Sequence, residues 1–190
     1  MNLANWLSLV RIILIPFFIS AIAYYRSDKD FLRYIALGIF MLAVISDWVD
    51  GYIARSKKLK TKIGSILDPI ADKLLLSSSF IILALAHDFP ANIRLPLWLP
   101  ILIISRDIIL VLGSVLTYMI TTKINIIPSL LGKLTTFFQM GTIICVLLQF
   151  SFSALIWHTA AFFTVISGID YILKGAKFLG TNNNHIKIKS

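Results

Sequence analysis

Four aspartates are the residues best suited to chemistry in this sequence, and they form two pairs. Asp47 and Asp50 stand three residues apart. Asp68 and Asp72 stand four apart, after a stretch 56–63 that carries four lysines. A helix brings residues three or four apart onto one face. If the stretch 56–63 returns the chain antiparallel, all four carboxylates can converge on one small space.

Carboxylates clustered in this way need positive charge beside them, because like charges repel and burial makes each charge costly. One or two divalent cations would supply it. Carboxylate oxygens with no His or Cys among them suit Mg²⁺ or Mn²⁺ better than zinc. Two ions bridged by carboxylates are a recurring device for displacement at phosphorus. The alternative is structural: the aspartates neutralise Lys73, Arg55 or Arg11 and so hold helices together.

Small and cationic residues lie among the aspartates. Gly51 follows Asp50 directly, Ala54 comes one turn later, and Gly64 opens the second pair's segment. Residues with so little bulk let a ligand approach the helix backbone closely, although they are also common where membrane helices pack. Arg55 adds a planar fork that suits phosphate. The pattern predicts a site for a phosphorylated ligand.

The elements that must position these residues are long apolar segments. Hydrophobic residues make up 58% of the 190 residues and charged residues 14%, which excludes a soluble enzyme and a disordered chain. A membrane span needs about 20 apolar residues. Six such runs follow one another, at 6–25, 31–54, 64–86, 95–120, 130–152 and 154–179. We predict an all-α integral membrane protein, a bundle of six transmembrane helices.

Loop charges predict the orientation of this bundle. The net charge is +9, and the basic residues crowd the link 55–62 and the end of the chain. The positive-inside rule places that link and both termini in the cytoplasm. We expect one transmembrane domain over 1–180 and a frayed, solvated cytoplasmic tail over 181–190. The segment 21–23 resembles a signal-peptide cleavage site, but Arg11 interrupts the apolar run before it, so the segment is expected to be retained.

The segment 47–72 reads D-x2-D-G-x2-A-R-x8-G-x3-D-x3-D. This is the signature of the CDP-alcohol phosphotransferase family, and the chain resembles that family at all eight fixed positions. The family's six spans and cytoplasmic termini agree with the predicted architecture. The resemblance implies a dimetal centre held by Asp47, Asp50, Asp68 and Asp72, with Asp72 also acting as general base. It further implies that CDP is bound by Asp47, Gly51, Ala54 and Arg55.

Two further segments resemble the bacterial phosphatidylglycerophosphate synthases of this family. The opening 5–11 matches N-x-x-T-x-x-R with Ser8 in place of threonine, and Asn5 and Ser8 are expected to contact CDP. The segment 128–136 looks like P-S-x-x-G-K-x-x-T. It implies that Ser129 and Lys133, together with Arg106, bind the phosphate of an acceptor.

Both cations also have a simpler interpretation, which stays open. Arg106 lies inside an apolar run and is expected in a buried ion pair with its neighbour Asp107, or with Asp170, if it binds no ligand. Lys133 stands near a helix start, where a lysine commonly reaches out to the membrane interface.

The resemblance implies that a phosphatidyl group passes from CDP-diacylglycerol to glycerol 3-phosphate, with Mg²⁺ or Mn²⁺ as cofactor. The expected setting is a bacterial cytoplasmic membrane, with the active site facing the cytoplasm. The family's dimers suggest a homodimer, and no nucleic-acid partner is expected. The segment 104–107 also looks like cardiolipin synthases, which use phosphatidylglycerol as acceptor. An ion-coupled transporter is the alternative class, but the carboxylates cluster once and no inverted repeat accompanies them.

Overall fold

The computed structural model describes residues 3–57, 64–91, 93–121 and 130–187. Within these ranges, the side chains of 3–5, 7, 48–57, 64–68, 114, 116–121 and 176–187 are not described. The regular structure of the described ranges is entirely helical: α1 (Leu3–Ala23), α2 (Phe31–Lys57), α3 (Gly64–Leu85), α4 (Trp98–Thr121), α5 (Leu130–Leu147) and α6 (Ser153–Lys187). Each predicted apolar run corresponds to one helix, so the prediction of an all-α chain with six helices is confirmed.

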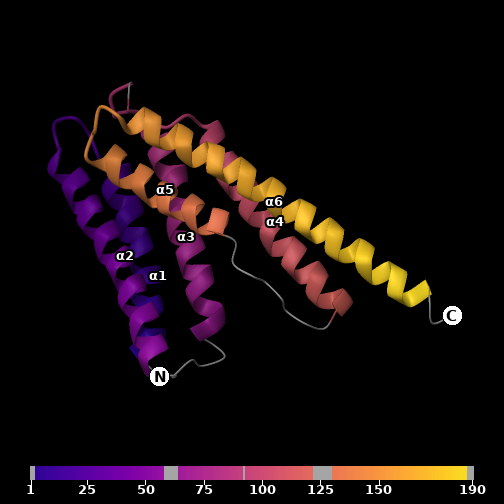
Figure 1. Ribbon diagram of the computed structural model, residues 1–190. Coiled ribbons are helices and arrows are strands. Elements are labelled where there is room, and N and C mark those ends of the chain that lie inside the picture. Colours follow the sequence, from indigo (N-terminus) through magenta and orange to yellow (C-terminus); the bar gives the residue numbers. More distant parts are fainter. Residues whose placement is uncertain (1–2, 58–63, 92, 122–129, 188–190) are drawn as a thin grey trace.

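The six helices run up and down and form two connected groups (Figure 1). α1 packs along both α2 and α3, while α6 packs along α4 and α5. Apolar side chains of α1, α2 and α3 meet in the first group, where Phe18 and Phe40 are fully buried with ring centroids 6.0 Å apart. Leu76 and Phe80 of α3 belong to the same core. α1 therefore lies between the two helices that carry the signature.

α5 ends earlier than its apolar run predicts. The run continues to residue 152, but the helix ends at Leu147. Gln149 has a φ of 54°, Phe150 N–H donates to the carbonyl of Cys145 at 2.9 Å, and Gln149 N–H donates to that of Val146 at 3.0 Å. These two bonds with a left-handed residue between them form a Schellman motif, which closes a helix. The position usually holds glycine, and here it holds glutamine.

The end of the chain also differs from the prediction. The segment 181–190 was expected to fray, but the backbone of α6 continues as a helix to Lys187. Residues 188–190 lie outside the described ranges. The cooperativity of helix formation explains the difference, because a helix that is already nucleated gains one backbone hydrogen bond for each residue it adds. The expectation of a frayed tail is therefore wrong for residues 181–187.

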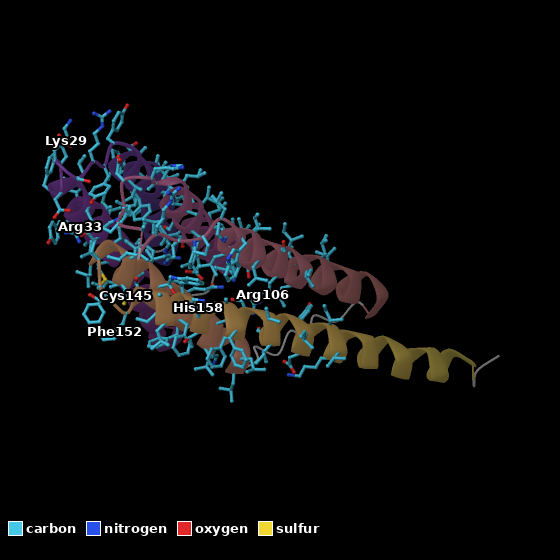
Figure 2. All side chains as sticks on the ribbon, turned by 90° about the horizontal axis from the view of Figure 1, so that it is seen from above. Lys29, Arg33, Arg106, Cys145, Phe152 and His158 are labelled. Atoms are coloured by element: carbon cyan, nitrogen blue, oxygen red, sulfur yellow. The ribbon has the colours of Figure 1, made fainter. Side chains whose placement is uncertain are left out.

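A polar clamp joins the α1–α2 connection to the end of α5. Arg33 is 5% exposed and donates to both carboxylate oxygens of Asp30, at 2.7 and 2.6 Å. Its third nitrogen donates to the carbonyl of Leu147 at 2.8 Å. Nearby, Gln149 donates to the hydroxyl of Tyr25 at 3.0 Å. Figure 2 shows Arg33 and Lys29 at this end of the molecule, away from Arg106.

Two helices of the described ranges are long and apolar enough to cross a membrane, Leu130–Leu147 and Ser153–Gly175. A shorter apolar helix covers Ser8–Ala23. The remaining helices carry the signature aspartates or the Arg106–Asp107 pair within their apolar runs. Membrane association fits these apolar helices, and the number of spans stays a prediction.

Candidate active site

The signature residues lie on α2 and α3, on the parts of these helices nearest the link 58–63. The backbone is helical from 47 to 55 and from 64 to 72, so the helical spacing predicted for both aspartate pairs is confirmed. Several predicted ligands lie outside the described side chains: Asn5, Asp50, Gly51, Ala54, Arg55 and Asp68. Ser129 lies outside the described residues altogether. The roles of these residues stay predictions.

Arg11 of α1 is the cation that contacts the first aspartate. Its side chain is 1% exposed, and its Nη2 lies 2.9 Å from Oδ1 of Asp47, whose side chain is 43% exposed. Ser8, one turn earlier on α1, is fully buried. The first helix thus holds a buried guanidinium against a carboxylate that is still open on its other side.

Asp72 of α3 lies in the same electrostatic environment. Asp47 is the charge that acts on it most strongly, followed by Lys73 and Arg11. Asp72 and Asp47 come from different helices and repel each other, so the fold brings two like charges together and places Arg11 beside them. The two signature carboxylates whose side chains are described thus influence each other, and the convergence of all four on one space stays a prediction.

This donor set fits a divalent cation. Two carboxylates that repel each other are an unfavourable arrangement without added positive charge, and Arg11 and Lys73 offset only part of that repulsion once Asp50 and Asp68 are counted. Oxygen donors without nitrogen or sulfur are the ligands that Mg²⁺ and Mn²⁺ prefer. The exposed side of Asp47 leaves an oxygen that a metal ion can reach.

A second polar cluster joins α3, α4 and α6. Asp107 Oδ1 accepts from Lys73 Nζ at 2.8 Å and from Arg106 Nη1 at 2.8 Å. Arg106 Nη2 donates to Ser167 Oγ at 2.5 Å. Figure 2 shows Arg106 between α4 and α6. Of the two ion pairs considered for Arg106, the one with Asp107 is confirmed.

The other pairing considered for Arg106 is wrong, because Asp170 pairs with Lys174 one turn along α6 at 2.7 Å. Lys133 is exposed on the first turn of α5. No contact joins it to the Arg106 cluster in the part of the chain that the structure describes. The structure thus links Arg106 to α3 through Asp107 and Lys73, and a shared role for Lys133 stays a prediction.

Lys73 was expected only as a partner of the signature aspartates, but it pairs with Asp107, and Ser167 was not predicted at all. Lys73 stands directly after Asp72, and its adjacency to a signature aspartate was the available signal. Nothing in the sequence marks Ser167 as a partner of Arg106, since serine is common in apolar helices. The two residues meet only because α4 packs on α6.

The chain is similar to known proteins along nearly its whole length. A family model described as CDP-alcohol phosphatidyltransferase matches residues 1–166. A Bacillus subtilis protein named CDP-diacylglycerol--glycerol-3-phosphate 3-phosphatidyltransferase is 37% identical over 199 aligned positions, covering 96% of this chain and 99% of that protein. A Mycobacterium tuberculosis protein named probable phosphatidylglycerophosphate synthase is 34% identical, covering 94% and 84%. An Aquifex aeolicus protein with the same name as the Bacillus one is 32% identical, covering 94% and 98%. The chain belongs to the CDP-alcohol phosphatidyltransferase family.

Proposed function

We propose that this protein transfers a phosphatidyl group from CDP-diacylglycerol to sn-glycerol 3-phosphate, giving phosphatidylglycerophosphate and CMP. The observation that carries the proposal is the near full-length similarity to relatives named for this reaction. The signature carboxylates supply the chemistry that such a transfer needs. The cluster around Arg106 supplies cations for a phosphorylated acceptor.

Members of this family generally use divalent metal ions. In this chain Asp47, Asp50, Asp68 and Asp72 would hold them, and two Mg²⁺ or Mn²⁺ ions suit four carboxylates. When bound, such ions stabilise the negative charge of the diphosphate and of the leaving CMP.

The chain's own residues orient the two substrates and move the proton. Asp72 accepts the proton of the sn-1 hydroxyl as that oxygen forms its bond to the β-phosphorus. The bond from this phosphorus to the bridging oxygen then breaks, and CMP leaves with the electron pair. Arg11 keeps the carboxylate of Asp47 in place and offsets part of the charge that Asp72 experiences.

The nucleotide and the acceptor would occupy different parts of the site. Gly51, Ala54 and Arg55 on α2, with Asn5 and Ser8 on α1, would bind the CDP group. Arg106, Ser129 and Lys133 would bind the phosphate of the acceptor. The two substrates would thereby be held on different helices and oriented toward each other for the transfer.

We infer that all six helices cross the membrane within one domain over 1–180. Large apolar side chains are exposed on each of them, including Phe17, Leu42, Ile81, Ile101, Phe137 and Phe162. Exposed apolar surface on this scale is unfavourable in water and favourable in lipid. We propose both termini and the tail 181–190 in the cytoplasm, on the positive-inside rule. The active site then faces the cytoplasm of a bacterial cell, and a homodimer is the expected assembly.

The test is an acceptor panel with the purified protein in detergent, measuring CMP release from CDP-diacylglycerol with Mg²⁺ or Mn²⁺. Glycerol 3-phosphate should support turnover, while serine and inositol phosphate should not. The alternative acceptor is phosphatidylglycerol, and its use without glycerol 3-phosphate would make the protein a cardiolipin synthase. Asp50→Asn should abolish turnover with every acceptor while the protein stays folded. Near wild-type activity in a folded Asp50→Asn variant would refute the metal site.

A further inference from the structure

One carboxylate oxygen accepts hydrogen bonds from two cationic side chains on two different helices. Oδ1 of Asp107 lies 2.8 Å from Nζ of Lys73 on α3 and 2.8 Å from Nη1 of Arg106 on α4. Asp107 is 8% exposed and Arg106 is 7% exposed, so the ion pair is largely removed from solvent. Lys73 is more open, with 34% of its side chain exposed.

The guanidinium of Arg106 is fixed from both sides. Nη1 donates to Asp107 and Nη2 donates to Ser167 of α6. The buried Nε has no hydrogen-bond partner in the described part of the chain, and neither has Oδ2 of Asp107. A buried donor without a partner costs free energy unless a ligand satisfies it. The guanidinium is therefore held on two sides, and its buried Nε is unsatisfied among the described residues.

The cluster also lies next to the reacting groups. Lys73 directly follows Asp72, and both Lys73 and Asp107 act electrostatically on Asp72. A phosphate monoester bound by these cations would therefore contact the helix that carries the proposed general base.

We propose that Asp107 is a positioning residue that holds Lys73 and Arg106 together as a preformed pair of cations for the phosphate of the acceptor. Lys73 thereby becomes a phosphate-binding residue beside Arg106, and Ser167 fixes the far side of the guanidinium. This inference rests on the proposed function, because it needs an acceptor that carries a phosphate.

The physical reason is the repulsion between the two cations. Two positive charges on one oxygen lie only a few ångströms apart, and their repulsion is strong where water is excluded. Without the carboxylate charge, Lys73 turns toward solvent and the acceptor must draw the cations together itself. Preorganisation of this kind lowers the cost of binding, so its loss raises KM for the acceptor.

The test compares Asp107→Asn with wild type in the CMP-release assay, with glycerol 3-phosphate and, separately, phosphatidylglycerol as the varied substrate. With whichever acceptor wild type uses, we expect Asp107→Asn to raise its KM about tenfold, the loss of roughly one charged hydrogen bond. KM for CDP-diacylglycerol should stay within about twofold, and kcat should fall less than the acceptor's KM rises. A general structural defect would change both KM values or the amount of folded protein.

Asp170→Asn is the matched control, because this aspartate also pairs with a lysine on a helix but lies outside the cluster. It should leave both KM values unchanged. If Asp107→Asn does not fold, Ser167→Ala takes its place and should raise the acceptor's KM about threefold. An unchanged or lowered acceptor KM in the folded variant would overturn the positioning role while leaving the proposed function intact. Wild-type protein that uses neither acceptor would instead refute the proposed function and this inference with it.

Discussion

Replacing Arg33 with methionine should destabilise the protein more than any change of a surface arginine. Methionine keeps most of the apolar stem of the side chain and removes the guanidinium. Three hydrogen bonds are lost: two to Asp30, at 2.7 and 2.6 Å, and one to the carbonyl of Leu147, at 2.8 Å. The clamp between the α1–α2 connection and the end of α5 is then gone.

The magnitude follows from the burial of each partner. Asp30 is 47% exposed, so its ion pair is screened by solvent and contributes little to stability. The Leu147 carbonyl is at a helix end, and its bond with Arg33 is buried. A buried carbonyl left without a partner costs about 1–3 kcal/mol. We therefore expect Arg33→Met to lower the free energy of unfolding by about 1–3 kcal/mol, chiefly through the buried carbonyl.

The assay is thermal unfolding in detergent micelles, followed by circular dichroism. Arg26→Met is the matched control, because Arg26 lies on the same connection with an exposed side chain. A surface change of this kind shifts the free energy by about 0.5 kcal/mol or less. Equal Tm shifts in the two variants would show that the clamp does not stabilise the fold, and the reasoning from these hydrogen bonds would fail.

Two more predictions concern packing and acid stability. Gly113→Ala should lower stability by about 1–3 kcal/mol, because a Cβ there would lie 2.6 Å from a ring carbon of Tyr171. Gly168→Ala should change Tm little, because its nearest neighbour would be 3.5 Å away, and similar Tm losses in both would contradict this. The hydrogen bond from Arg33 lowers the pKa of Asp30, so its contribution is present at neutral pH and lost as pH falls below about 4. The Tm gap between wild type and Asp30→Asn should close over that range, and a gap independent of pH would rule out this linkage.

The helices were predictable because each corresponds to a long apolar run, in which no single residue decides the prediction. Six apolar runs of about 20 residues can only be helices in a chain without barrel-type alternation, and their order follows from the sequence itself. The end of α5 was not predictable in the same way. The left-handed position is occupied by Gln149, and a glutamine carries no stop signal. The closing contact to Leu147 comes from Arg33, more than a hundred residues earlier.

The candidate site was likewise predictable only in part. The spacing within each pair, Asp47 with Asp50 and Asp68 with Asp72, predicts that the two aspartates of a pair share one face of their helix. The signature identifies the family. The partner of each charge depends on which helix packs beside it, and spacing along one helix says nothing about that. Arg11, Lys73 and Asp107 are all visible as charges in apolar runs. Arg11 was among the cations considered for the aspartates and does pair with Asp47, whereas the pairing of Lys73 with Asp107 required the three-dimensional arrangement.

The position of α1 between α2 and α3 has a consequence for how the protein is made. All eight signature residues belong to the later two helices, but α1 packs along both of them and supplies Arg11. On the proposed six-span architecture, synthesis from the N-terminus would bring α1 into the membrane before either carboxylate-bearing helix. The aspartate-bearing helices could then enter the bilayer with Arg11 already present as a counter-charge for Asp47. A chain without its first helix would keep the whole signature and would have to insert those aspartates unaccompanied.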